Sequence, residues 1–486
     1  MNVIVVMLDS LRPDHLGCYG NRWIKTPNID EFAKECTIFE RAYAEGLPTL
    51  PVRTALFTGK YTLPFRGWQK LEPNDVPIAE ILWDKGYTTA LITDTYHMHK
   101  PGMAYERGFD YVEWIRGQES DPYVTDPDVK VDLEKWHHKN YSTGQYFRNL
   151  SEEEQKKLFM QYLRNTAYWK GEEDHFVAQV MKTGARWLEN QVERGRRDRL
   201  FLWLDSFDPH EPWDPPEKYY EIYAPPEYKD KPIIWGGGGA KEFTELEIQH
   251  IRAQYAGEVT LVDKWFGWFI SRVKELGLWE NTLIVLLSDH GEPLGEHGII
   301  RKVRPWPYEE LSRIVLMVRH PEGTGKGRRV RAFVETVDVM PTILDCLNIE
   351  YHREQSPWGV KVEDIHGRTL LPLMRDETKA VKDFAVSGHY MRSLSIRDGD
   401  YTLYIWLKSE AEYQWGLKPI DISEKEKVKP ELYKTKRDYV PPPPRDYNWE
   451  RDLPEKENII DVEKDIAKDL ELKLRKKMME LLGYQS

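Results

Sequence analysis

The chain has 486 residues, 40% of them hydrophobic, which is enough for a large core and two or three domains. Lys and Arg total 69 against 81 for Asp and Glu, and this net charge of −12 argues against general affinity for nucleic acid or anionic membranes. The apolar run Val3 to Leu8 is far shorter than the roughly 20 residues of a membrane span. The three cysteines include no CxxC pair and fit a reducing compartment, so a cytoplasmic chain is expected.

Four apolar runs rich in β-branched residues are typical of strands buried on both faces of a parallel sheet. Each run leads to an acid, and the runs cover residues 2–9, 87–94, 200–205 and 282–289. Helical patterns lie between them, one of which begins at Pro27 and another of which closes at Gly277. This alternation predicts an α/β fold with a large, mostly parallel sheet sandwiched by helices.

Residues 115–182 interrupt the alternation. They are polar and aromatic, with a helical pattern at residues 152–168, and we interpret them as an insertion. Towards the C-terminus, short alternating runs surround the turn at Asp398–Gly399, and a helix with one apolar face follows. These changes divide the chain into a main α/β domain, residues 1–390, and a small α+β domain with an antiparallel sheet and a terminal helix, residues 391–486.

The acids Asp9, Asp94, Asp205 and Asp289 fall at the carboxyl ends of the predicted strands, where open α/β sheets bind their ligands. Each acid alone also fits a carboxylate that caps a loop, but the four together predict a site. His290 directly follows Asp289. With Asp9, this pair supplies three N/O ligands for a divalent metal that keeps open positions, although a plain turn is the alternative.

Pro48 and Pro51 frame the hydroxyl residue Thr49, and Arg53 follows four positions later. If a helix begins near Pro51, Thr49 lies beside unpaired backbone amides, which favour a developing alkoxide and an anionic ester. Arg53 would then lie one turn along and orient the hydroxyl or pair with the anion. The simpler interpretation is a helix cap at Thr49 and a surface charge at Arg53.

With further motifs, these residues resemble the sulfatase-like branch of the alkaline phosphatase superfamily, which includes sulfatases, phosphonate monoester hydrolases and phosphodiesterases. The resemblance runs through most of the chain, and the landmarks keep the order of the family. After the strand ending at Asp9 they are RPDHLGCYG (12–20), TPNID (26–30), LPVR (50–53) with TG (58–59), DPHEPW (208–213), SDHGE (288–292), LGEHG (294–298), Lys302, VDVMPT (337–342) and HGR (366–368).

The resemblance implies a metal site in which Asp9, Asp289 and His290 are ligands and Thr49 completes the shell. The family's common Asp-Asp pair is Asp9-Ser10 here, and His290 stands where asparagine is common. Because nitrogen replaces oxygen among the ligands, one manganese or zinc ion is favoured, with iron or calcium as alternatives.

The resemblance also implies that Arg53, His210 and Lys302 surround the ester. Lys302 lies at the position of the family's sulfate- or phosphate-binding lysine, where it can neutralise a non-bridging oxygen or the leaving group. His210, which precedes a proline, is the candidate general acid for the departing alkoxide, and a hydrogen-bonded loop histidine is the alternative.

Thr49 differs from the residue that sulfatases have at this position, and this difference determines the expected reaction. Sulfatases oxidise a cysteine or serine at this position to formylglycine, and threonine cannot yield that aldehyde because its β-carbon bears a methyl group. Phosphodiesterases of the superfamily use an unmodified threonine, which attacks phosphorus and is released by hydrolysis of the threonyl phosphate. We therefore expect a phosphodiester or a phosphonate monoester as the substrate, and no formylglycine.

A second departure concerns substrate binding. The family often has Gly-Lys-x-His where this chain has Asp94-Thr95-Tyr96-His97, so one cation of the pocket is missing. A singly charged ester suits such a pocket better than a dianion, and Thr95, His97 and Trp213 are expected to line it. A second metal would need Asp205, Asp208, His210 and His297, and we do not predict one.

The sequence is also compatible with two other functions. A sulfatase that activates water on the metal without formylglycine is the closest alternative. An inactive relative that keeps the fold as a binding module is the other, because one change at the nucleophile is enough to lose activity. In each case the partner is a small-molecule phosphate, phosphonate or sulfate ester, and the terminal helix and aromatic insertion leave room for a homo-oligomer.

Overall fold

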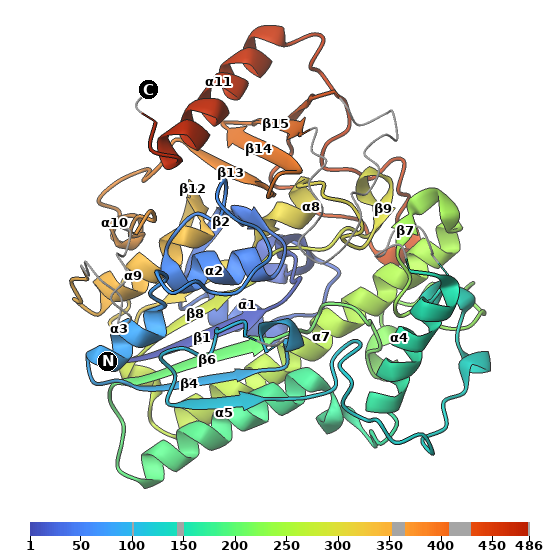
Figure 1. Ribbon diagram of the computed structural model, residues 1–486, viewed down its shortest axis with the longest axis horizontal. Helices are drawn as coiled ribbons and strands as arrows, with labels where there is room; N and C mark the ends of the chain where they lie inside the picture. Colours follow the sequence, from blue (N-terminus) through green and yellow to red (C-terminus); the bar gives the residue numbers. More distant parts are fainter. Residues whose placement is uncertain (100–101, 143–149, 352–364, 408–428, 485–486) are drawn as a thin grey trace.

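A computed structural model describes residues 1–99, 102–142, 150–351, 365–407 and 429–484 (Figure 1). Its main sheet has nine strands in the order β10-β2-β11-β8-β1-β6-β4-β5, and β12 also pairs with β2. The strands are β1 (Asn2–Leu8), β2 (Thr37–Tyr43), β4 (Thr88–Thr93), β5 (Tyr111–Trp114), β6 (Leu200–Ser206), β8 (Thr282–Leu287), β10 (Arg313–Ile314), β11 (Leu316–Arg319) and β12 (Arg329–Glu335).

The central strands β8, β1, β6, β4 and β5 are parallel, and both faces of β1 are buried. Ile4 and Val6 belong to one hydrophobic core, whereas Val3 and Val5 belong to the other. The first core is closed by α1 (Pro27–Ala33), α4 (Glu152–Asn165), α5 (Phe176–Glu193) and α7 (Glu245–Glu275). The second is closed by α2 (Leu50–Thr58), α3 (Ile78–Asp84), α9 (Val339–Cys346) and α10 (Leu371–Met374). The predicted sheet between two helix layers is confirmed.

A second sheet of five strands lies at the top of the view in Figure 1, beside the terminal helix α11 (Lys464–Leu481). Its order is β16 (Glu431–Lys434), β15 (Tyr401–Trp406), β14 (Ser393–Asp398), β13 (Phe384–His389) and β3 (Gly46–Leu47). Strands β13 to β16 are antiparallel, and α11 packs on them through Leu470, Leu474 and Met478. The predicted hairpin and terminal helix are both present. Two short helices, α6 (Glu217–Tyr220) and α8 (Glu309–Ser312), and a two-stranded ribbon of β7 (Gly238–Gly239) and β9 (Ile299–Ile300) are also present.

Two boundaries expected from the sequence, at residues 391 and 182, fall inside an observed sheet and an observed helix. The limit at residue 391 falls between β13 and β14, because the antiparallel part of the small sheet already begins at Phe384. The last residues of the segment 115–182 form the start of α5, which packs in the main helix layer. Strand β3 is parallel to β13 and pairs Leu47 with His389, so the small sheet directly adjoins the loop that carries Thr49.

None of the helices in the described parts of the chain combines the length and apolar composition that crossing a membrane requires.

Candidate active site

Three of the four acids at the strand ends converge on one arginine. The guanidinium of Arg53 is fully buried and donates to Asp9 Oδ2 at 3.0 Å, to Asp289 Oδ2 at 2.7 Å, and to the two Asp205 oxygens at 2.7 and 3.0 Å. Asp94 lies apart from this group, since it accepts from the backbone N–H of the residue that follows β6. The single positive charge of Arg53 therefore offsets part of the repulsion among three buried carboxylates.

Thr49 occupies the N-cap position of α2, and its backbone has an unusual conformation. Its φ angle is 39°, in the left-handed region that a β-branched residue rarely adopts. Arg53 holds the Thr49 carbonyl through its backbone N–H at 3.1 Å and through Nη1 at 3.3 Å. The Oγ1 of Thr49 lies 3.3 Å from His290 Nε2. The expected helix at this point is confirmed, and the strained residue is the one whose hydroxyl lies beside His290.

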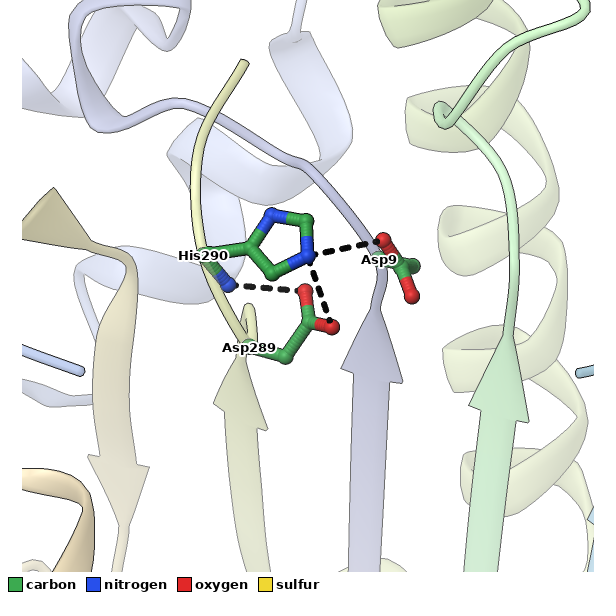
Figure 2. A group of neighbouring side chains, drawn as sticks. All are labelled: Asp9, Asp289 and His290. Atoms are coloured by element: carbon green, nitrogen blue, oxygen red, sulfur yellow. Dashed lines mark hydrogen bonds and ion pairs between the residues drawn. The ribbon is translucent and has the colours of Figure 1, made fainter. Parts of the chain in front are cut away.

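His290 is oriented as a metal ligand would be (Figure 2). Its Nδ1–H donates to the carbonyl of Gly291 at 2.8 Å, which leaves the Nε2 lone pair directed toward the carboxylates. His290 Nε2 lies 3.8 Å from Asp9 Oδ1 and 3.4 Å from Asp289 Oδ2, and one donor atom from each of the three residues lies within 4.8 Å of the others. With Thr49 Oγ1, this arrangement fits a divalent cation bound by one nitrogen and several oxygens.

The protonation of the group also suits a cation. Burial lowers the pKa of His290 to about 4, so its imidazole is neutral at pH 7. Burial and the neighbouring carboxylate of Asp289 raise the pKa of Asp9. A bound cation would relieve that repulsion and favour the ionised form of Asp9.

Lys302 connects this group to further carboxylates. Its Nζ lies 3.4 Å from Ser10 Oγ and 3.2 Å from Glu211 Oε2, and it is ion-paired with Glu292. Burial would lower the pKa of Lys302, but Glu211 and Glu292 outweigh that effect and raise it. Lys302 is therefore a permanent positive charge beside Ser10. It lies at one side of the group formed by Asp9, Asp289 and His290, called the metal group below.

The other expected site residues take different places. Thr95 Oγ1 donates to Asp205 at 2.8 Å and so belongs to the network around Arg53. His97 donates through Nε2 to Glu119 at 3.1 Å. The structure does not bring Trp213 to the site: its side chain has no exposed surface, packs in the first core, and donates its indole N–H to a backbone carbonyl.

His210 lies in a second group of ligand-type side chains. One donor atom from each of Glu119, His210 and Glu211 lies within 4.8 Å of the others, and all three residues are buried. The remaining candidates for a second metal are elsewhere: Asp208 accepts from a backbone N–H at the start of α5, and His297 pairs with another carboxylate at 2.9 Å.

Several residues of the site were missed in the sequence. Glu211 and Glu292 lie inside the motifs DPHEPW and SDHGE, so their neighbours His210 and His290 were the signal that could have found them. Glu119 had no such signal, because it lies in the segment interpreted as an insertion. Its φ of 47° and its contact with His97 become visible only in the fold.

Comparisons with known proteins show the family and the fold of the chain. A family model described as Sulfatase matches residues 1–349. An N-acetylglucosamine-6-O-sulfatase of Bacteroides thetaiotaomicron is 26% identical over 435 residues, which cover 80% of this chain and 73% of that protein. An arylsulfatase of Clostridium perfringens is 23% identical over 496 residues, covering 90% of this chain and 92% of the relative. The solved structure of a phosphonate monoester hydrolase of Agrobacterium radiobacter has a TM-score of 0.69 at 20% identity, over 99% of this chain and 95% of that one, which shows a shared fold.

Proposed function

The chain belongs to the sulfatase family of ester hydrolases, and we propose that it cleaves a phosphodiester or a phosphonate monoester with Thr49 as the nucleophile. One observation carries the proposal. The Oγ1 of Thr49 lies 3.3 Å from Nε2 of His290, which belongs to the group Asp9, Asp289 and His290. A threonine cannot be converted to the formylglycine of sulfatases. The hydroxyl itself is thus the group in position to attack.

Asp9, Asp289, His290 and Thr49 would hold one divalent cation, and manganese or zinc suits their mixed nitrogen and oxygen donors. Such a cation supplies a positive charge that favours the alkoxide form of Thr49. The N-terminal amides of α2 favour the same negative charge. Arg53 holds the Thr49 carbonyl and three carboxylates, so we assign it the role of positioning the nucleophile.

The reaction would have two steps. Thr49 Oγ1 loses its proton and forms a bond to phosphorus while the bond from phosphorus to the leaving oxygen breaks. The leaving oxygen takes up a proton and departs as the alcohol, which leaves a threonyl phosphate or phosphonate. Water then attacks phosphorus, the bond to Oγ1 breaks, one proton of the water returns to Thr49, and the phosphate monoester or phosphonate is released. In the first step Lys302 is the cation available to offset charge on an ester oxygen.

We assign the stabilisation of the leaving group to the charge of Lys302 and not to proton donation by His210. The Nδ1–H of His210 donates to the carbonyl of Glu211 at 2.7 Å, and burial lowers the pKa of His210 to about 3. At neutral pH the Nε2 of His210 therefore carries a lone pair and no proton for a leaving group. Thr95 and His97 remain our candidates for residues that border the ester.

Hydrolysis of a sulfuric ester without formylglycine is the second candidate, because the curated relatives described above are named sulfatases. In that case water bound at the metal group would attack sulfur, and the Thr49 hydroxyl would only be a ligand. The two candidates differ in whether turnover needs the hydroxyl of Thr49.

Turnover of bis-p-nitrophenyl phosphate, a phenylphosphonate ester, p-nitrophenyl phosphate and p-nitrophenyl sulfate separates the candidates. The protein is loaded with manganese or zinc and compared with Thr49→Val, which keeps the shape of the side chain, and with Thr49→Ser, which keeps a hydroxyl. We expect diester or phosphonate turnover that falls about a thousandfold or more in Thr49→Val and survives in Thr49→Ser. Sulfate turnover that survives in Thr49→Val would overturn the proposal in favour of metal-bound water.

A further inference from the structure

We propose that Glu119, His210 and Glu211 form a second divalent-cation site, separate from the group of Asp9, Asp289 and His290. The three residues are 5%, 5% and 2% exposed, and they come from two distant segments of the chain. One donor atom of each lies within 4.8 Å of the others, which is close enough for a single ion to contact all three. The inference concerns ion binding alone and does not depend on which residue is the nucleophile.

The two candidate groups orient their histidines in the same way. In each, the Nδ1–H donates to the carbonyl of the next residue, at 2.8 Å from His290 to Gly291 and at 2.7 Å from His210 to Glu211. This hydrogen bond fixes the tautomer and leaves the Nε2 lone pair for a ligand, as is usual for histidines that bind metals. A histidine that acted as a proton donor through Nε2 would instead carry a proton on that nitrogen, as the imidazolium or as the other tautomer.

The carboxylates are also held by outer partners. Arg301 pairs with Oε1 of Glu211 at 2.6 Å, which leaves Oε2 as the oxygen nearer His210, at 3.2 Å from its Nδ1. Glu119 accepts a hydrogen bond from His97 at 3.1 Å. Hydrogen bonds of this kind to ligating carboxylates are the usual second layer of a metal site. Lys302, which also lies 3.2 Å from Glu211 Oε2, has Glu292 as another partner.

The charge of the surrounding network favours a second cation. The ion pairs of the two groups and their neighbours involve six carboxylates and three permanent cations. The carboxylates are Asp9, Asp205, Asp289, Glu119, Glu211 and Glu292, and the cations are Arg53, Arg301 and Lys302. Because carboxylates outnumber cations in this network, a second divalent ion at Glu119 and Glu211 would reduce the repulsion among them.

The donor set indicates the kind of ion. An imidazole nitrogen with carboxylate oxygens suits manganese, iron, cobalt or zinc, whereas calcium and magnesium prefer oxygen alone. The two groups are linked through Lys302, which lies 3.4 Å from Ser10 Oγ on one side and 3.2 Å from Glu211 Oε2 on the other. A second ion would therefore lie next to the proposed site of ester cleavage.

The test is the metal content of the full-length protein. The protein is stripped with a chelator, reloaded with excess manganese or zinc, desalted, and analysed by inductively coupled plasma mass spectrometry. We expect two ions per chain in the wild type and one in Glu119→Gln, which removes a ligand charge at constant shape. His210→Asn gives the same loss by a different side chain, and Asp289→Asn should lose the other ion and keep one.

The readout separates this inference from the proposed reaction. Thr49→Val should lose phosphoester turnover and still bind the ion of Glu119, His210 and Glu211, so a failure of the proposed nucleophile leaves the expected occupancy of this second site unchanged. Circular dichroism confirms that each variant is folded before its metal is counted. One ion per chain in the wild type, or equal metal content in the wild type, Glu119→Gln and His210→Asn, would overturn the inference.

Discussion

At the scale of single residues, Arg53 determines how the site is assembled. Its side chain has no exposed surface and contacts Asp9, Asp205 and Asp289, which belong to three separate strand ends. A lysine would not reproduce these contacts, because only the guanidinium offers five donors in a planar fork. The residue therefore explains why three acids far apart in the sequence can be buried together.

Arg53→Ala should destabilise the protein strongly, because it leaves buried carboxylates without their cation. We expect a loss of about 3–5 kcal/mol in the free energy of unfolding, measured by urea denaturation at neutral pH in the presence of a chelator. Arg331→Ala is the matched control: Arg331 pairs with Glu40 but is 81% exposed, so its loss should cost at most about 1 kcal/mol. Equal effects of the two substitutions would contradict this account of Arg53.

At the scale of elements, the short strand β3 places the Thr49 loop. Gly46 and Leu47 pair with Gly388 and His389 of β13, so the loop is fixed between the small sheet and α2. Gly46 is required here because a side chain would not fit: an added Cβ atom would lie 1.9 Å from Thr62 Oγ1. That hydroxyl donates to the buried carboxylate of Glu45 at 2.7 Å and cannot move away without losing the bond.

Gly46→Ala should therefore lower both stability and turnover. Displacing Thr62 removes a hydrogen bond to a buried carboxylate and shifts the start of the Thr49 loop, at a cost of about 1–3 kcal/mol. Thermal unfolding and kcat on the preferred ester measure the two effects. Gly171→Ala is the control, since nothing lies within 4 Å of an added Cβ there, and its stability should stay within about 0.5 kcal/mol of the wild type. An unchanged kcat in Gly46→Ala would show that β3 does not position the nucleophile.

At the scale of the whole molecule, patterns that are local in the sequence predicted the fold well. The buried runs before Asp9, Asp205 and Asp289 indicated parallel strands, and their shared direction brings the three acids to one edge of the sheet. The helix after Thr49 followed from Pro51. Each of these inferences rests on a period or a cap that a few consecutive residues define.

Contacts between distant segments could not be predicted in the same way. Asp94 and Asp205 look alike in the sequence, but only Asp205 lies in reach of Arg53, since the side chain of Asp94 is held by a backbone N–H. Glu119 joins His210 and Glu211 although about ninety residues separate them and no motif marks it. Strand β3 has two residues, too few for any hydrophobic period, and its pairing with β13 depends on the tertiary fold.

The stereochemical course at phosphorus tests the central claim, attack by Thr49, most directly. A chiral phosphorothioate diester is hydrolysed in water enriched in oxygen-18, and the configuration of the product is determined. Each in-line displacement inverts phosphorus, so attack by Thr49 followed by hydrolysis of the threonyl intermediate predicts net retention. Net inversion would mean that water attacks the ester in a single step, and it would contradict the assignment of Thr49 as the nucleophile.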